Sequence, residues 1–249
     1  MSTHTNKPLS LVGEKADRFI LQGLASHGFE VLLLPTDDRL PIPVSSHADM
    51  LIFALNENIF CNKAYYEHNM PIFEQVKKYG YKINISDFKV SSNYPSDISL
   101  NQAVIGKNII GRYDSCAGAI LKFAEEYGYD YCSIKQGYAK CSTLILGEKA
   151  IVSADAGIIS LAENLGISTL KIENGINEKT HSGYNYGFIG GASAVYDQKV
   201  FFFGDISKHS QGKKIAQFCE DNGFTVISLG KEALSDVGGA IILPYLNKK

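Results

Sequence analysis

One phrase recurs along the chain: an amphipathic stretch, a glycine, an aromatic or aliphatic residue, then a short β-prone run. It occurs five times, as SHGFEVLLL, KYGYKINI, EYGYDYCSI, NLGISTLKI and DNGFTVISL. Each glycine stands where a helix must end in the left-handed conformation, which glycine adopts without steric cost. The preceding stretches have helical spacing of apolar residues, as in Ile120, Phe123 and Ala124. Each phrase therefore predicts a helix followed by a strand.

The spacing of these glycines relates the two ends of the chain. The intervals between Gly28, Gly80, Gly128, Gly166 and Gly223 are 52, 48, 38 and 57 residues. From Gly223 through both chain ends to Gly28 the interval is 54 residues, which matches the others. The C-terminal and N-terminal segments are therefore predicted to complete one unit together.

Two further β-prone runs precede the helix in each unit. They are HADMLIFAL and NIFCN, SLNQAVIG and NIIGR, KCSTLILG and AIVSAD, GASAVYD and KVFFFGD, with VGGAIILPY before the C-terminus. Five strand–strand–helix–strand units with circular closure predict one α/β domain over residues 1–249, a five-bladed α/β propeller around a central pore. A doubly wound sheet, the alternative, would alternate one strand with one helix. The extra hairpin in each unit disfavours it.

Composition narrows the classes of function. With 45% hydrophobic and 20% charged residues the chain can bury a full core. A net charge of −2 gives no basic field, so no nucleic-acid partner is expected. No apolar run reaches the ~18 residues of a membrane span, and the polar start lacks the core of a signal peptide. Five scattered cysteines without a CxxC pair favour a reducing, cytoplasmic setting and suggest no metal site. We expect a small-molecule partner and no cofactor, and the oligomeric state stays open.

The first strands can be laid over one another by their apolar runs. This alignment matches His47, Ser99, Lys140, Gly191 and Val237. Two positions later in each strand it matches Asp49, Asn101, Ser142, Ser193 and Gly239. Because strand side chains alternate between faces, these positions would point the same way. The pore mouth would then gather the candidate ligand-binding set His47, Asp49, Asn101, Lys140, Ser142 and Ser193. The alternative is that polar residues at strand starts are merely solvated.

A closed ring of five such units resembles the pentein fold of guanidine-modifying enzymes, such as arginine deiminases and amidinotransferases. The stretches QGYAKCST, GYNYGFIGG and SDVGGAIIL further resemble an uncharacterised bacterial family of that superfamily, and the resemblance covers nearly the whole chain. The superfamily also contains a ribosome anti-association factor without catalysis. For His47-Ala48-Asp49, which resembles the HxD element of the hydrolases, the resemblance implies a general acid/base and a carboxylate that holds the guanidinium.

The nucleophile departs from the pentein pattern. Those enzymes carry a cysteine after a glycine-rich run near the C-terminus, whereas here the run continues from Gly239 into Ala240 and Ile241. Cys141, beside Lys140, is the candidate replacement, since a neighbouring ammonium lowers a thiol pKa. Strand alternation, however, would turn Cys141 into the core, where free cysteine packs as a small hydrophobe.

Carboxylates and a long loop complete the candidate site. Asp155 follows the second strand of its unit and precedes a helix, so it is either a helix cap or a channel residue. Asp236 precedes the twin glycines and could face the pore. Segment 173–191 contributes Tyr184, Tyr186 and Phe188, either as a lid or as an aromatic-packed connection.

These observations predict a protein that binds a small cationic ligand of the guanidine, amidine or amine type at the pore. Catalysis at a guanidino carbon, as a hydrolase or transferase, would use His47, Asp49 and Cys141. The alternative is a non-catalytic binding or interaction propeller that has lost the usual cysteine. The sequence does not decide between an enzyme and a binding module.

Overall fold

A computed structural model describes residues 7–173 and 187–246. These residues form five separate three-stranded sheets. In every sheet the first two strands pair antiparallel, and the third pairs parallel with the second. The sheets are β3 (Ile52–Leu55), β4 (Asn58–Asn62) and β5 (Lys82–Ser86); β6 (Ala103–Ile105), β7 (Asn108–Gly111) and β8 (Asp130–Ser133); β9 (Thr143–Leu146), β10 (Ala150–Ser153) and β11 (Ser168–Lys171); β12 (Ser193–Tyr196), β13 (Lys199–Phe202) and β14 (Thr225–Ser228); and β15 (Ile241–Leu243), β1 (Leu9–Gly13) and β2 (Glu30–Leu34).

The two ends of the chain share one sheet. β15 pairs antiparallel with β1, with Leu243 opposite Leu9, and β1 pairs parallel with β2. The glycine spacing predicts that the two chain ends complete one unit together, and this prediction is confirmed. The strand β1 itself is an addition, because the sequence analysis assigned no strand to LSLVG.

Helices connect the second strand of each sheet to the third. They are α1 (Arg18–Ser26), α3 (Lys63–His68), α4 (Met70–Lys78), α5 (Gly118–Glu126), α6 (Ala156–Asn164) and α7 (Gly212–Asp221), with α2 (Ala48–Leu51) outside this pattern and 3₁₀ turns at Ile42–Val44, Tyr113–Ser115 and Ile206–Lys208. The glycine after each of the five predicted helices has a positive φ, from +66° at Gly128 to +98° at Gly80. This confirms the predicted helix ends.

The predicted first strands begin too early. Residues 48–51 form α2, and the residues before β9 and β12 form tight turns, in which Ser142 N–H donates to Tyr138 O and Ala192 N–H to Phe188 O. The hairpins pair Leu55 with Asn58, Ile105 with Asn108, Leu146 with Ala150 and Tyr196 with Lys199. In this register His47 corresponds to Asp97, Tyr138 and Phe188, so the predicted alignment was wrong. Period-two alternation does not apply to residues in a turn.

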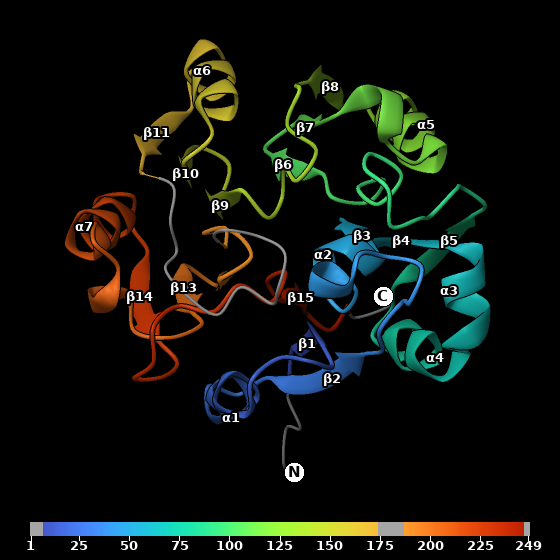
Figure 1. Ribbon diagram of the computed structural model, residues 1–249, viewed down its shortest axis with the longest axis horizontal. Coiled ribbons are helices and arrows are strands. Elements are labelled where there is room, and N and C mark those ends of the chain that lie inside the picture. Colours follow the sequence, from blue (N-terminus) through green and yellow to red (C-terminus); the bar gives the residue numbers. More distant parts are fainter. Residues whose placement is uncertain (1–6, 174–186, 247–249) are drawn as a thin grey trace.

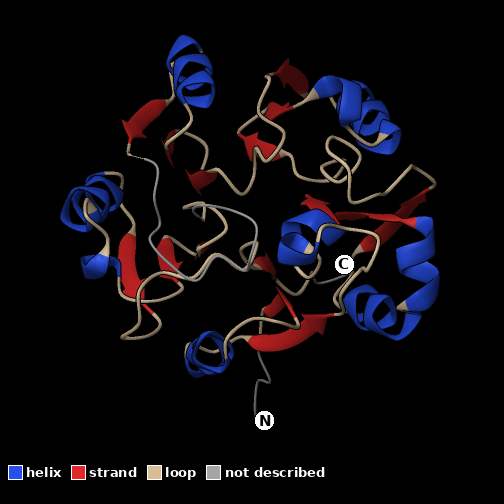
Figure 2. Ribbon diagram, in the orientation of Figure 1, coloured by secondary structure: helices blue, strands red, loops and turns tan. Residues whose placement is uncertain are grey.

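The hydrophobic core is divided among the sheets. Five clusters of buried side chains each lie between two sheets, and in β4 Ile59 and Cys61 belong to one cluster and Phe60 to the next. Alternation along a central strand thus buries both faces of a sheet. Figure 1 shows the five sheets around a common centre, with most helices at the periphery and α2 nearer the centre (Figure 2). Within residues 7–173 and 187–246 no strand pair joins one sheet to another, and no helix there could span a membrane.

Candidate functional site

Three reactive side chains meet in one buried cluster. His47 immediately precedes α2, Asp49 lies in its first turn, and Cys141 lies in the turn before β9. One nitrogen, one oxygen and the sulfur of these residues all lie within 4.8 Å of one another. Their exposed fractions are 6%, 3% and 1%. The predicted candidates His47, Asp49 and Cys141 are therefore together, although they precede the first strands of two different sheets.

Asn101 holds this cluster together. Its Oδ1 accepts hydrogen bonds from the backbone N–H of Lys140, at 2.9 Å, and of Cys141, at 3.2 Å. Its Nδ2 donates to Cys141 Sγ at 3.1 Å, and the thiol in turn donates to Asp49 Oδ2 at 3.0 Å. Asn101 is fully buried and precedes β6, so it joins a third sheet to the other two. Cys141 is buried, as strand alternation predicts, but it contacts polar groups and not an apolar core.

Asp236 approaches the cluster from the fifth sheet. Its Oδ1 accepts from Gly238 N–H at 3.0 Å and its Oδ2 from Phe188 N–H at 2.7 Å. His47 Nδ1 lies 3.9 Å from Asp236 Oδ1. The predicted site residues Asp236 and Phe188 are thus connected to each other by a backbone hydrogen bond.

Two glycines make this close approach possible. A Cβ on Gly238, whose φ is +76°, would lie 2.2 Å from the Cβ of His47. A Cβ on Gly191 would lie 1.9 Å from Asp236 Oδ1. Real Cβ atoms do not approach other atoms so closely, so the sequence patterns IGG and DVGG serve to seat His47 and Asp236.

Burial dominates the electrostatics of the cluster. It raises the pKa of Asp49 to about 7; the Lys140 charge and the Cys141 hydrogen bond act against this, and Asp236 adds to it. Burial also raises the pKa of the Cys141 thiol well above its usual value, helped by the negative charges of Asp49 and Asp236. At neutral pH the thiol is therefore protonated. Asp49 Oδ1 is buried and has no hydrogen-bond partner among the described residues.

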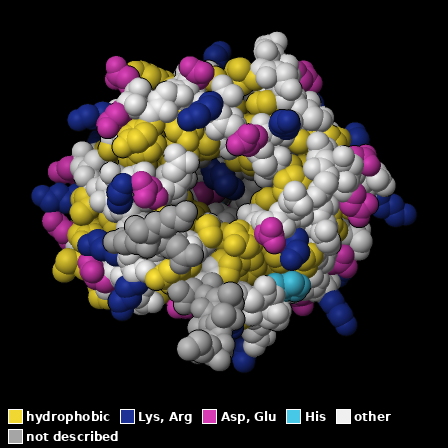
Figure 3. Space-filling model, turned by 180° about the vertical axis from the view of Figure 1, so that it is seen from behind, with side chains coloured by type: hydrophobic (Ala, Val, Ile, Leu, Met, Phe, Trp, Pro, Cys, Tyr) yellow, Lys and Arg dark blue, Asp and Glu magenta, His cyan; other side chains and the backbone are white. Residues whose placement is uncertain are grey.

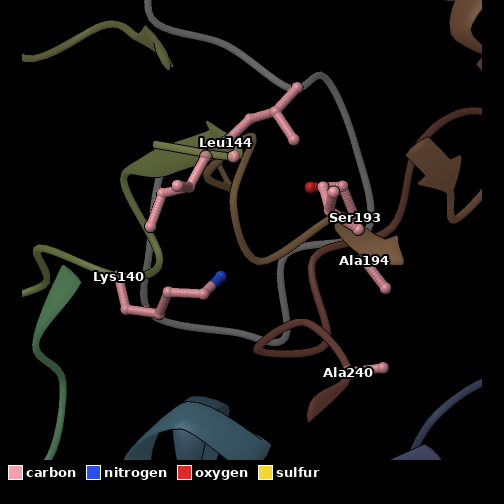
Figure 4. Close-up of a pocket in the computed structure, with 8 residues that line it drawn as sticks. Lys140, Leu144, Ser193, Ala194 and Ala240 are labelled. Carbon is pink, nitrogen blue, oxygen red and sulfur yellow. The ribbon is translucent and has the colours of Figure 1, made fainter. Parts of the chain in front are cut away.

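Lys140, the residue before Cys141, lines a cavity of about 290 Å³. Its ammonium points into the cavity (Figure 4). The face opposite to that of Figure 1 is hollowed at its centre, where a basic and an acidic side chain are visible (Figure 3). The cavity is lined by Lys140, Leu144, Ile145, Gly147, Ser193, Ala194, Val195 and Ala240.

The other predicted site residues have distinct places. Asp155 caps α6 by accepting from Ile158 N–H at 2.9 Å, and its second oxygen accepts from Gln136, so the capping alternative holds. Ser142 is buried beside Cys141, and its hydroxyl has no partner among the described residues. Phe188 stacks on Tyr138, with ring centroids 6.2 Å apart. Tyr184 and Tyr186 lie outside the described residues.

A second cavity, of about 310 Å³, lies between segment 36–39 and α3. Its cation, Arg39, is paired in a bidentate fashion with Asp37, at 2.9 and 2.6 Å. Arg39 is therefore already paired within this cavity, and no cysteine is among its lining residues. The central cluster is therefore the better candidate for chemistry.

A family of unknown function, DUF6873, matches residues 11–241. The chain belongs to this family. A search of curated proteins gave no match.

Solved structures with the same fold are guanidine-modifying enzymes. Dimethylarginine dimethylaminohydrolase from Pseudomonas aeruginosa superposes on the DUF6873 chain with a TM-score of 0.58 at 12% identity, covering 94% of this chain and 96% of the enzyme. An amidinotransferase of saxitoxin biosynthesis from Microseira wollei gives 0.59 at 10% identity, covering 98% and 95%. Agmatine deiminase from C. jejuni gives 0.56 at 9% identity, covering 96% and 94%. The chain has the pentein fold, as its resemblance implies.

Two features of the site are not predicted by the sequence. Asn101 is predicted only to lie at the pore, whereas it accepts hydrogen bonds from the backbone of Lys140 and Cys141. The sequence shows no metal-ligand spacing, although His47, Asp49 and Cys141 offer one nitrogen, one oxygen and one sulfur in a single cluster. Neither feature has a signal in linear spacing, because the residues come from separate units.

Proposed function

We propose that this chain is a single-domain, five-bladed α/β propeller, residues 1–249, that binds a small guanidine-, amidine- or amine-type cation at its centre. The convergence of Cys141 Sγ, Asp49 and His47 within 4.8 Å carries the proposal. The five cores between successive sheets support the ring, because the sheet made from the two chain ends shares cores with the first sheet and the fourth.

The charges of the cluster favour a cation. Asp49 and Asp236 bring two carboxylates to the cluster, and Asp49 Oδ1 has no partner among the described residues. A guanidinium is planar and positively charged, and its N–H donors can form paired hydrogen bonds with carboxylates on more than one edge. Binding such a cation would return Asp49 to its ionised form, because a positive neighbour lowers the pKa of a carboxyl group.

The same cation would activate Cys141. Burial, Asp49 and Asp236 keep the thiol protonated in the free protein, and a bound cation offsets the negative charge that opposes the thiolate. The thiolate sulfur would attack the central carbon of the guanidinium, forming a C–S bond. The C–N bond to the leaving amine then breaks, and His47 passes the thiol proton to that amine. Water would complete hydrolysis, or an acceptor amine would complete transfer, and either step returns the thiol.

The solved structures support this class of ligand. Their names describe action on dimethylarginine, agmatine and amidino groups, and one is a cysteine-to-serine variant with citrulline bound. At 9–12% identity they share the fold with this chain.

Binding and turnover should be measured on the same compounds. Agmatine, arginine and dimethylarginine would be tested by calorimetry and by release of ammonia or amine. We expect Cys141→Ser to abolish turnover while keeping affinity, and Cys219→Ser, a matched buried cysteine in α7, to keep both. Turnover that persists in Cys141→Ser would refute the assigned nucleophile. A lack of binding by every guanidine, amidine and amine tested would refute the proposed ligand class.

The burial of Cys141 favours one alternative, a non-catalytic binding protein. With 1% of its surface exposed, the thiol could serve only as a hydrogen-bond donor to Asp49. In that case the wild-type protein would bind cations without turnover. Iodoacetamide would then modify Cys141 no faster in the presence of a bound cation than in its absence.

A further inference from the structure

The cavity beside Lys140 runs along the first strands of two neighbouring sheets. Its lining extends from Lys140, in the turn before β9, to Gly147, in the hairpin after β9, and includes Ser193 to Val195 of β12. None of the three residues His47, Asp49 and Cys141 of the catalytic cluster proposed above lines the cavity. Lys140, which does line it, directly precedes Cys141 in the chain.

The Lys140 ammonium is the charged group of this cavity. Among the described residues its hydrogen-bond acceptor is Gly190 O at 3.4 Å, and no carboxylate lies within 4.0 Å of it. An ammonium has three donors, so donors remain for a ligand. Figure 4 shows the nitrogen directed into the space between β9 and β12. An anion in the cavity would therefore meet a preformed partner.

The walls limit what kind of anion fits. Leu144, Ile145, Ala194 and Val195 are apolar, and the hydroxyl of Ser193 already donates to Ile189 O at 2.8 Å. A phosphate requires several donors around its oxygens, and this lining offers one ammonium. The volume of about 290 Å³ corresponds to roughly ten water molecules at ~30 Å³ each. The space suits a small molecule with one charged end and an apolar body.

We propose that this cavity is a binding site for a small monocarboxylate with a short aliphatic chain. The carboxylate would pair with Lys140, and the chain would lie against the apolar side chains of β9 and β12. Small-molecule sites typically combine apolar walls with a few placed polar groups. The proposal rests on the cavity alone and stands whether or not the chain acts on guanidines.

The test uses three probes of equal chain length on the full protein. Sodium butyrate, butyramide and 1-butanol would be titrated separately and followed by calorimetry and ligand-observed NMR. We expect butyrate to bind at millimolar concentration or better, and the uncharged amide and alcohol to bind much more weakly. Because none of these probes is a cation, failure here is distinguishable from failure of the proposed function.

Variants of Lys140 locate the binding. Lys140→Met should weaken butyrate binding roughly ten- to hundredfold, the usual worth of a charge-assisted hydrogen bond, and Lys140→Arg should retain most of it. Lys149→Met, a change of an exposed lysine in the same hairpin, is the matched control and should leave affinity unchanged. Circular dichroism would establish that each variant is folded. Unchanged affinity in a folded Lys140→Met, equal binding of butyramide, or no butyrate binding would each overturn the proposal.

Discussion

The buried cluster and the cavity lined by Lys140 are built in opposite ways. In the cluster, His47, Asp49 and Cys141 are almost fully buried, and hydrogen bonds with Asn101 fix the thiol and the backbone around it. The cavity along β9 and β12 has apolar walls and one cation with few partners. The cluster concentrates negative charge and polar contacts, and the cavity presents a single positive charge.

This difference shows how similar units can hold two dissimilar groups of side chains. The cluster is formed by the turns that precede the first strands, where each unit has its own residues. The apolar walls of the cavity come mainly from β9 and β12, where the repeated apolar pattern prevails. We therefore expect substitutions in the turns to cost more stability than comparable substitutions in the cavity wall, and the following predictions test this.

The largest difference is expected between Asn101→Ala and Ser193→Ala. The first change leaves the N–H groups of Lys140 and Cys141 without their acceptor and opens a buried hole, which should cost about 4 kcal/mol of unfolding free energy. The second removes one donor to Ile189 O and should cost about 1 kcal/mol. Urea denaturation would measure both, and equal costs would contradict the comparison.

A smaller difference is expected between two glycines. An alanine Cβ at Gly191 would collide with Asp236 Oδ1, whereas at Gly147, with φ +64°, its nearest contact would be Phe224 at 3.5 Å. We expect Gly191→Ala to cost about 3 kcal/mol through steric displacement. Gly147→Ala should cost about 1 kcal/mol through its left-handed backbone alone. Thermal unfolding of the two variants side by side checks this, and a milder effect at Gly191 would show that Asp236 is free to move.

The pH dependence of stability should be governed by the cluster. Because the pKa of Asp49 is raised from 3.8 to about 7, the folded state holds a proton that the unfolded state releases above pH 4. Stability from this group is present at low pH and is lost as pH rises toward 7. Between pH 5 and pH 7 the loss should be about 2 kcal/mol. Asp49→Asn should flatten this slope in urea titrations, and an unchanged slope would assign it to another group.

The sequence predicted the repeated unit better than the site. The five glycines gave the helix ends, because a positive φ favours glycine wherever it occurs. The candidates His47, Asp49 and Cys141 also proved to be neighbours. The apolar surroundings predicted for Cys141 were wrong, because the residues before β9 form a turn in which Ser142 N–H donates to Tyr138 O. Such contacts, and the role of Asn101 across three sheets, depend on packing that no local pattern encodes.

The smallest predicted effect concerns the positive charge of Lys140, which acts on Asp49 of the cluster and also lines the cavity. Lys140 acts against the upward shift of the Asp49 pKa, so its positive charge is felt in the cluster and opposes a second cation there. If the proposed ligand class is right, Lys140→Met should bind agmatine more tightly, by roughly two- to fivefold, or about 1 kcal/mol or less. The measurement belongs at pH 8, where Asp49 is mostly ionised. Lys149→Met again serves as the control.

Butyrate offers an independent way to neutralise the same charge. A carboxylate paired with Lys140 should raise the affinity of the wild-type protein for agmatine by a similar factor, and agmatine must then raise the affinity for butyrate equally, since coupling between two ligands is reciprocal. In Lys140→Met the coupling should vanish. Calorimetric titration of each ligand in the presence of the other tests both directions. Weaker agmatine binding in Lys140→Met would mean that Lys140 positions the cationic ligand, and the cluster and the cavity would then be parts of one site.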